Sequence, residues 1–136
     1  MTINNTPIRV KDVMKTDFGT IDGIATVADA LRKMKHLKTA VLIVNKRHEN
    51  DEYGMVTSGD IARHVLARDR APDRVNVYEI MNKPVITVHP DMDIRYCSRL
   101  FANYNLVRAP VIENNLVIGM VSPNSLVLDG MYKTFQ

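Results

Sequence analysis

The sequence predicts a mixed α/β (α+β) fold, built from two β-α-β-β-α repeats that pack as a pseudo-symmetric pair. Two observations carry this prediction: one sequence pattern occurs twice, and the same succession of helix-like and strand-like periodicities follows it each time. The chain has 136 residues, of which 46% are hydrophobic and 24% charged, close to the average for globular proteins. Half of that length is marginal for a domain that folds alone, so we expect the two copies to fold together.

The repeat begins with a short lead-in and continues to a glycine-containing strand. Val10–Met14 (VKDVM) matches Val77–Met81 (VYEIM). Further along, Gly54–Thr57 (GMVT) matches Gly119–Ser122 (GMVS). Because the matches occur in the same order, they indicate a duplicated structural unit rather than a chance similarity of short strings.

The bounds of the repeat define two domains. We expect a first domain at residues 7–71 and a second at 74–133, with Ala71–Asp73 as the link between them, because proline and aspartate there favour a turn. The first copy has the longer hairpin loop, Lys46–Glu52, which is wholly polar, as a surface loop should be.

Each copy then shows a helix with one apolar face, a hairpin and a second helix. The apolar residues of the two first helices recur at helical spacing; they are Val27, Ala30, Leu31, Met34 and Leu37, then Ile94, Cys97, Phe101 and Tyr104. The strand-like runs lie at 41–44 and 53–57, then at 110–112 and 117–121. The apolar residues of the second helices are Ile61, Ala62, Val65 and Leu66, then Leu126, Val127 and Met131. A strand should also precede each first helix, clearly at Val85–Val88 and more weakly at Phe18–Ile21.

Composition narrows the function classes. Eighteen basic and 15 acidic residues give a net charge of +3, spread along the chain and too small to indicate nucleic-acid binding by itself. The longest aliphatic run, Ala40–Val44, has five residues, whereas a membrane-spanning helix needs about 20. The single cysteine, Cys97, cannot form an internal disulfide, so we expect a reducing, cytoplasmic setting. The histidines lack metal-ligand spacing and no glycine-rich phosphate loop is present, so we expect neither a metal nor a catalytic site.

The turn after the first hairpin carries the most specific chemistry. Thr57 and Asp60 lie three residues apart where a strand ends and a helix begins. This is the spacing of a capping box, in which two side chains satisfy backbone N–H groups at the helix start. A helix start also suits an anion, but the Asp60 carboxylate is an acceptor suited to the vicinal diol of a ribose and unsuited to a phosphate. Both roles stay open, and they can coexist.

The second copy separates these two roles. Its turn has Ser122 at the position of Thr57 and Ser125 at the position of Asp60. Ser122 can still cap a helix, and Pro123 suits the first helical position. The carboxylate is absent, so we expect the second site to be weaker, empty or occupied by something else.

Together, these features resemble the CBS domain, which is named after cystathionine β-synthase and usually occurs as a tandem pair. The lead-in, the element order and the Gly-apolar-x-Thr/Ser-x-x-Asp turn carry the resemblance from about Val10 to Tyr132. It implies a regulatory module that binds adenine nucleotides or related adenosyl ligands in clefts between the copies, and that often dimerises. It also implies that Thr57 and Asp60 contact the sugar, and that Thr20 and Thr87 line the adenine cleft.

Other candidate ligand contacts are less specific. Small or apolar residues begin each hairpin and could let a flat base approach, although core packing explains them equally well; they are Ala40, Val41, Ala109 and Pro110. Arg108, Arg63 and His64 could meet a phosphate. For Arg63 and His64, a solvated helix face is the alternative explanation.

The sequence therefore predicts a stand-alone, non-enzymatic sensor that binds AMP, ADP, ATP, NAD or S-adenosylmethionine and acts on an unidentified protein partner. We expect a homodimer, formed through exposed apolar helix edges that include Leu66, Leu128 and Met131. Two alternatives stay open: a structural dimerisation module without a small-molecule ligand, and a nucleic-acid-binding module permitted by the net positive charge.

Overall fold

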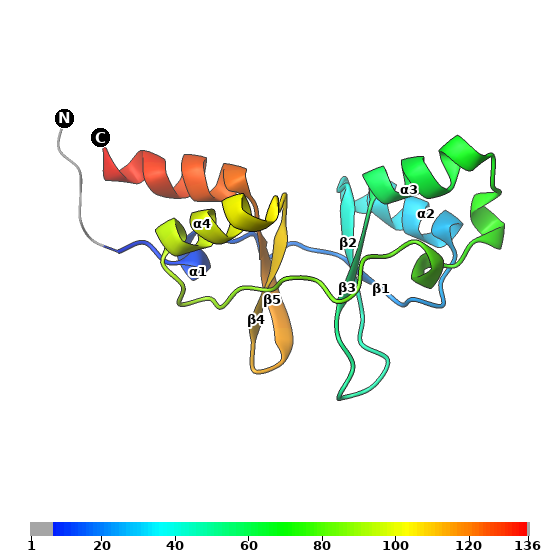
Figure 1. Cartoon of the computed structure of the whole chain (residues 1–136), viewed down its shortest axis with the longest axis horizontal. Coiled ribbons are helices and arrows are strands. Elements are labelled where there is room, and N and C mark those ends of the chain that lie inside the picture. The colour runs from blue at the N-terminus through cyan, green and yellow to red at the C-terminus, as the bar shows by residue number, and fades with distance from the viewer. Residues whose placement is uncertain (1–6, 136) are drawn as a thin grey trace. The chain divides into compact units, whose positions relative to one another are not determined.

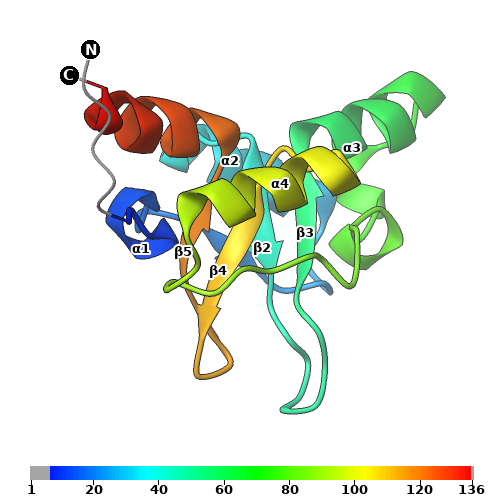
Figure 2. The same cartoon turned by 60° about the vertical axis from the view of Figure 1, so that its left-hand side comes forward.

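The computed structural model describes residues 7–135, which fall into two compact units (Figures 1 and 2). Unit 1 contains the N-terminal part of the chain up to Asp17 and the part from Ile86 onward, and unit 2 contains Phe18–Val85. The mixed fold and the tandem repeat are confirmed. The units nevertheless do not coincide with the repeats at 7–71 and 74–133, because the lead-in of each copy belongs to the unit that holds the rest of the other copy.

Unit 2 combines a three-stranded sheet with two helices that share one apolar core. Its strands, in the order β1-β2-β3, are β1 (Thr20–Ile21), β2 (Val41–Val44) and β3 (Gly54–Thr57). β1 is parallel to β2, and β2 is antiparallel to β3. The loop between β2 and β3 extends from the end of the strands away from α3 (Figures 1 and 2). The helices are α2 (Val27–Leu37) and α3 (Ser58–His64), followed by 3-10 turns at Leu66–Arg68, Pro72–Arg74 and Val77–Glu79.

The predicted capping and periodicity explain α2. Thr26 caps the helix, because its side chain accepts the Asp29 N–H at 3.1 Å, while the Asp29 carboxylate accepts the Thr26 N–H at 3.1 Å. Of the predicted apolar face, three residues are buried and two are partly exposed; the buried ones are Val27, Ala30 and Met34, and the exposed ones are Leu31 and Leu37. The apolar face is therefore narrower than the sequence suggests.

Unit 1 contains a two-stranded antiparallel sheet, β4 (Ala109–Glu113) and β5 (Leu116–Val121). Its helical elements are α1 (Val10–Val13), α4 (Ile94–Tyr104), a π-helical segment at Ser125–Gly130 and a 3-10 turn at Met131–Thr134. The core contains Val10, Val13, Val88, Ile94, Cys97, Phe101, Ala109, Val111, Val121 and Leu126. Tyr104, predicted on the apolar face of α4, is exposed in the last turn of that helix.

The second helix of each repeat also buries only part of its predicted apolar face. In unit 2, Ile61 and Val65 are buried whereas Leu66 is exposed, and Ala62 is exposed as well. In unit 1, Leu126 is buried, whereas Val127 and Met131 are exposed. Among residues 7–135, no helix is both long and apolar enough to cross a membrane.

The prediction for the strands that precede the first helices was wrong in its emphasis. The weaker candidate forms β1, whereas Val85–Val88 forms only an isolated bridge at Val88. In this bridge the Val88 N–H donates to the Pro110 carbonyl at 3.0 Å, and the Val88 carbonyl accepts the Ile112 N–H at 2.9 Å. In a parallel ladder the preceding hydrogen bond would need the N–H of Pro110, and the following one the N–H of Pro90. Proline has no N–H, so the ladder cannot extend in either direction.

Candidate ligand-binding site

The turn between β3 and α3 forms the capping box that the sequence predicts. The Thr57 Oγ1 accepts the Asp60 N–H at 3.1 Å, and the Asp60 Oδ2 accepts the Thr57 N–H at 2.9 Å. The Thr57 hydroxyl also lies 2.9 Å from the same carboxylate oxygen and donates to it. The capping role of Thr57 and Asp60 is therefore confirmed.

Asp60 is buried, and two exposed side chains donate hydrogen bonds to its carboxylate. Its exposed fraction is 2%. The Arg63 guanidinium donates to Oδ1 at 2.9 Å, and the Asn82 side-chain amide lies 3.3 Å from both carboxylate oxygens. Asn82 is exposed, and the Arg63 side chain is 65% exposed. A buried carboxylate needs compensating hydrogen bonds, and here half of them come from groups that can return to water.

The start of β2 lies beside this turn. Val41 pairs with Thr57 in the sheet, and the Ala40 carbonyl accepts the Ser58 N–H at 2.9 Å. Since the Asp60 N–H is also taken, two N–H groups of the first turn of α3 already have partners. The short helix therefore has few free N–H groups to offer a phosphate.

The structure brings five of the predicted contacts of the first copy together and leaves two apart. Those that lie together are Ala40, Val41, Thr57, Asp60 and Arg63. Thr20 lies on β1, on the other side of β2 and in register with Ile43. His64 is the last residue of α3 and is half-buried.

The second turn keeps the cap without the carboxylate. The Ser122 Oγ lies 3.3 Å from the Ser125 Oγ and accepts the Ser125 N–H at 3.4 Å. Ser125 is 2% exposed; among the described residues, it and Asp60 are the buried polar or charged side chains. The two copies therefore bury a polar group at the same position of the turn, but only the first buries a charge.

The remaining candidates of the second copy lie in unit 1. Ala109 and Pro110 begin β4 and pair with Val121 and Met120, so they lie next to the turn at Ser122. Arg108 directly precedes β4 and is half-buried, and Thr87 is exposed and belongs to no strand.

Asn82 is a site residue that the sequence analysis did not identify. It forms an isolated backbone pair with Met55, in which each N–H donates to the other carbonyl at 2.9 Å. In unit 1, Lys15 forms the same pair with Met120, at 2.8 Å in both directions. Asn82 therefore pairs beside the turn that contains the Asp60 carboxylate, whereas Lys15 pairs beside the turn that has Ser125 instead. In the sequence, this difference is visible in the residue that follows each lead-in methionine, which is Lys15 after Met14 and Asn82 after Met81.

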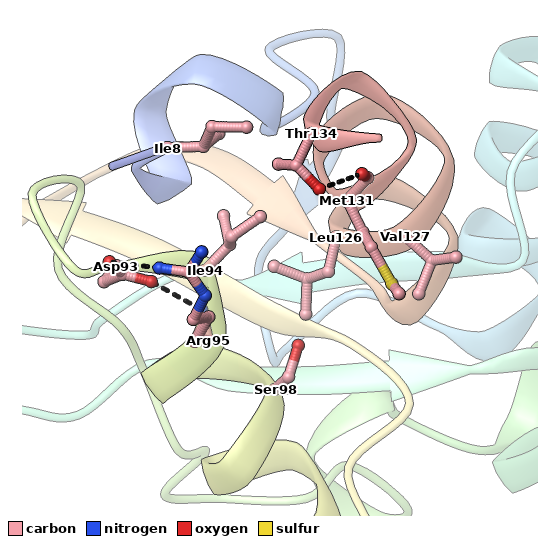
Figure 3. A pocket seen from close by; sticks show the side chains of 9 residues that line it. All are labelled: Ile8, Asp93, Ile94, Arg95, Ser98, Leu126, Val127, Met131 and Thr134. Carbon is pink, nitrogen blue, oxygen red and sulfur yellow. Dashed lines mark hydrogen bonds and ion pairs between the residues drawn. The ribbon is translucent and has the colours of Figure 1, made fainter. Parts of the chain in front are cut away.

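A pocket with an apolar lining in unit 1 lies elsewhere, between α4 and the C-terminal helical segment (Figure 3). One pocket of about 420 Å³ is lined by Ile8, Asp93, Ile94, Arg95, Ser98, Leu126, Val127, Met131 and Thr134. A second pocket of about 450 Å³ shares Ser98, Leu126 and Val127 with it. We call the two together the α4 groove. None of the predicted ligand contacts lines it.

A pocket of about 490 Å³ in unit 2 lies at the end of β2 away from the turn at Thr57. It is lined by Gly23, Ile24, Val44, Asn45, Arg47, Tyr78, Met81 and Lys83. Its cations have an acidic partner: the Lys83 ammonium donates to the Asp51 carboxylate at 2.7 Å. This hydrogen bond, together with that from the Arg47 N–H, holds the pKa of Asp51 well below its ordinary value.

Sequence comparison agrees with the duplicated architecture. The sequence profile of the CBS domain matches residues 10–67 and 77–128. The chain belongs to the CBS-domain family. Among solved structures, the hexameric CBS-CP12 protein from bloom-forming cyanobacteria is similar to this CBS pair, with a TM-score of 0.88 and 39% sequence identity, and the match covers 94% of this chain and 71% of that one. Proteins with CBS-domain pairs are generally regulatory rather than catalytic.

Two further comparisons bear on this CBS pair. An uncharacterized protein of Methanopyrus kandleri is 30% identical over 122 residues; the match covers 88% of this chain but 61% of that protein. The CBS-domain pair of the protein MJ0100, solved in complex with 5′-methylthioadenosine and S-adenosyl-L-methionine, has a TM-score of 0.75 and 24% identity, with 89% of this chain and 98% of that one covered. At that identity the likeness shows the fold.

Proposed function

We propose that this CBS pair is a regulatory sensor that binds an adenine nucleotide or a related adenosyl ligand and has no catalytic activity of its own. The family and the adenosyl ligands of the MJ0100 pair support the ligand class. The observation that carries the proposal is the buried Asp60 carboxylate, which accepts hydrogen bonds from two exposed side chains, Arg63 and Asn82.

Asp60 would bind the ribose of the ligand. The two hydroxyl groups of a vicinal diol can donate to the carboxylate in the place that Arg63 and Asn82 occupy, and such charge-assisted hydrogen bonds are short and strong. The displaced guanidinium of Arg63 would then be free to meet a phosphate, which the capped start of α3 cannot hold. The small and apolar residues Ala40 and Val41, which flank the turn, would lie against the base.

The two turns should differ in affinity. A ribose hydroxyl at Ser125 would gain a neutral hydrogen bond instead of a charge-assisted one, which is about half as strong. A difference of about 1 kcal/mol per bond separates two sites about fivefold in affinity. We therefore propose one tight site per chain, at Thr57 and Asp60, and a weaker or empty one at Ser122 and Ser125.

Isothermal titration calorimetry tests this proposal. AMP, ADP, ATP, NAD and S-adenosylmethionine are titrated separately into protein stripped of bound nucleotide. Asp60→Asn should weaken binding of the preferred ligand about 5- to 100-fold, whereas Ser125→Ala, the matched change in the second copy, should leave the tight site unchanged. Two equal sites per chain, or a tight site lost in Ser122→Ala but kept in Asp60→Asn, would contradict the assignment.

The alternatives have their own outcomes in the same experiment. If none of the five ligands binds, the structural dimerisation module is favoured. If a single-stranded oligonucleotide binds with an affinity that falls steeply with salt, the nucleic-acid-binding module is favoured, because release of counterions produces that dependence.

We also propose that the chain forms a homodimer, through the α4 groove. Leu128 and Met131 lie on the C-terminal helical segment beside this groove and are 63% and 56% exposed, and the exposed Val127 lines it. Apolar side chains gathered on one face are typical of an interaction surface. Leu66, 75% exposed, offers a further apolar edge in unit 2.

Analytical ultracentrifugation at micromolar concentration tests this second proposal. Met131→Asp should convert a dimer into a monomer, whereas Val107→Asp, a change of the same kind at an exposed residue outside the groove, should not. A monomeric wild-type protein would contradict the proposal.

The setting we propose is the cytoplasm, in agreement with the free and buried thiol of Cys97.

A further inference from the structure

The last part of unit 2, residues 76–85, leads into unit 1 and contacts the candidate ligand turn through Asn82. We use the name connector for residues 76–85. The Asn82 backbone pairs with Met55 of β3, and its side-chain amide reaches the carboxylate of Asp60. Three residues further along, at Val85, the chain leaves unit 2. Any change at Asp60 that moves Asn82 therefore acts on the part of the chain that leads out of this unit.

We propose that Asn82 is a positioning residue that competes with the ligand for Asp60, so that a bound diol displaces it and loosens the connector. This inference rests on the proposed function, because it requires a ligand with a diol at Asp60. It adds the residue through which occupancy of the turn reaches the rest of the chain.

Asn82 is the partner of Asp60 that gives way at the lowest cost. Its amide lies 3.3 Å from each carboxylate oxygen, whereas the nitrogens of Thr57 and Arg63 lie at 2.9 Å. Hydrogen bonds at the longer distance and shared between two acceptors are weaker. Because Asn82 is exposed, its amide can exchange Asp60 for water without being left unsatisfied.

The backbone pair between Met55 and Asn82 has no neighbouring pair to support it. Extension on one side would need an N–H at Pro84, which proline lacks. Extension on the other side would need the N–H of Thr57, which already donates to Asp60. Next to this pair, the connector is held by two side chains: Asn82 at Asp60, and Lys83, whose ammonium donates to Asp51 of the β2–β3 loop at 2.7 Å. Asn82 is the one of the two that reaches the candidate ligand turn.

Unit 1 provides a natural comparison. Lys15 makes the same backbone pair, but its ammonium lies 3.2 Å from the Asp129 carboxylate, at the far end of the helical segment rather than at the turn. The buried residue of that turn is Ser125, which offers no carboxylate. The side-chain link between the turn and the connector is therefore a property of unit 2, which contains Asp60.

Calorimetry with AMP and with adenosine, which has no phosphate, provides the first measurement. Asn82→Ala removes the competitor and should tighten binding of both probes about 3- to 10-fold. Asn82→Lys introduces the residue found at the matching position of unit 1, Lys15; its ammonium should pair with Asp60 and weaken adenosine binding. Asn76→Ala is the matched control, because Asn76 lies in the same connector and donates to the Ile24 carbonyl at 2.9 Å without contacting Asp60. It should leave both affinities unchanged.

Amide hydrogen exchange provides the second measurement. In the wild-type protein, saturating AMP should accelerate exchange of the Met55 and Asn82 amides severalfold, because displacement of the side chain weakens the pair. In Asn82→Ala the exchange should be fast already and should not respond to AMP. A residue with only a structural role would not change the ligand dependence.

The outcomes separate this inference from the proposed function. If the wild-type protein binds AMP while Asn82→Ala binds it equally or more weakly, the inference is wrong and the proposed function stands. If Asn82→Ala does not fold, adenosine binding to Asn82→Lys decides, and unchanged or tighter binding overturns the inference. If neither probe nor any adenosyl ligand binds the wild-type protein, the proposed function is wrong and the inference falls with it.

Discussion

Replacing Asp60 by alanine should destabilise the fold far more than the matched replacement of Ser125. The carboxylate accepts hydrogen bonds from the Thr57 N–H, the Thr57 hydroxyl, Arg63 and Asn82. The last two groups are exposed and can bind water instead. The groups of Thr57 are half-buried and lose both a capping partner and an acceptor. A lost cap costs about 1 kcal/mol, and a hydrogen bond to a charged group is worth about 1.5–3 kcal/mol.

From these contributions we expect Asp60→Ala to lower the free energy of unfolding by about 2–3 kcal/mol, since the two contributions overlap at Thr57. Ser125→Ala removes neutral hydrogen bonds of 3.3 Å and 3.4 Å, and we expect a loss of about 0.5–1 kcal/mol. Circular dichroism during thermal unfolding should show a decrease in Tm of roughly 10 °C for the first variant and roughly 3 °C for the second. Equal decreases, or a smaller one for Asp60→Ala, would refute the view that Asp60 organises the turn.

Three further predictions concern acid stability, thiol reactivity and packing. The Lys83 ammonium lowers the pKa of Asp51 in the folded state. The ionised carboxylate therefore stabilises the fold fully above the pKa of the unfolded state, about 4, and this stabilisation is lost as the pH falls further. Urea unfolding should show a steeper loss of stability below pH 4 in the wild-type protein than in Asp51→Asn. Burial raises the pKa of Cys97 to about 11, so iodoacetamide at pH 8 should alkylate it in urea but scarcely in the folded protein. Gly119→Ala would place Cβ 2.9 Å from the Lys15 carbonyl oxygen and should lower the free energy of unfolding by about 1–3 kcal/mol. In Gly59→Ala the nearest atom to Cβ, at 3.2 Å, is the tip of the flexible Arg63 side chain, so this variant should raise the free energy of unfolding by about 0.5 kcal/mol. Denaturant titration measures both changes.

The sequence was sufficient to predict the repeat, the element order and the capping box. Periodicity and capping depend on neighbouring residues, so a local pattern determines them. Thr57 and Asp60 illustrate this, because they are three residues apart and their geometry follows from the helix start.

What the sequence could not predict depends on residues far apart in the chain. The strand at Val85–Val88 fails because of a proline on its partner, Pro110, and no pattern within the run itself records that. The contact between Asn82 and Asp60 joins residues 22 positions apart. The repeat pattern likewise does not show which unit buries which lead-in. The two lead-ins have the same apolar pattern, so either unit could bury either one.

The exchange of lead-ins between the units has a mechanical consequence. Unit 2 is inserted into unit 1, so both ends of the described chain, residues 7 and 135, belong to unit 1, and unit 2 is connected to it at residues 17–18 and 85–86. If the protein is stretched between its ends in an optical trap, the load passes through unit 1 first. Unit 2 should bear no tension until unit 1 has opened, so the extension trace should show two steps in a fixed order. A pulling partner fused to either terminus would likewise spare the turn at Asp60 until the other unit had yielded.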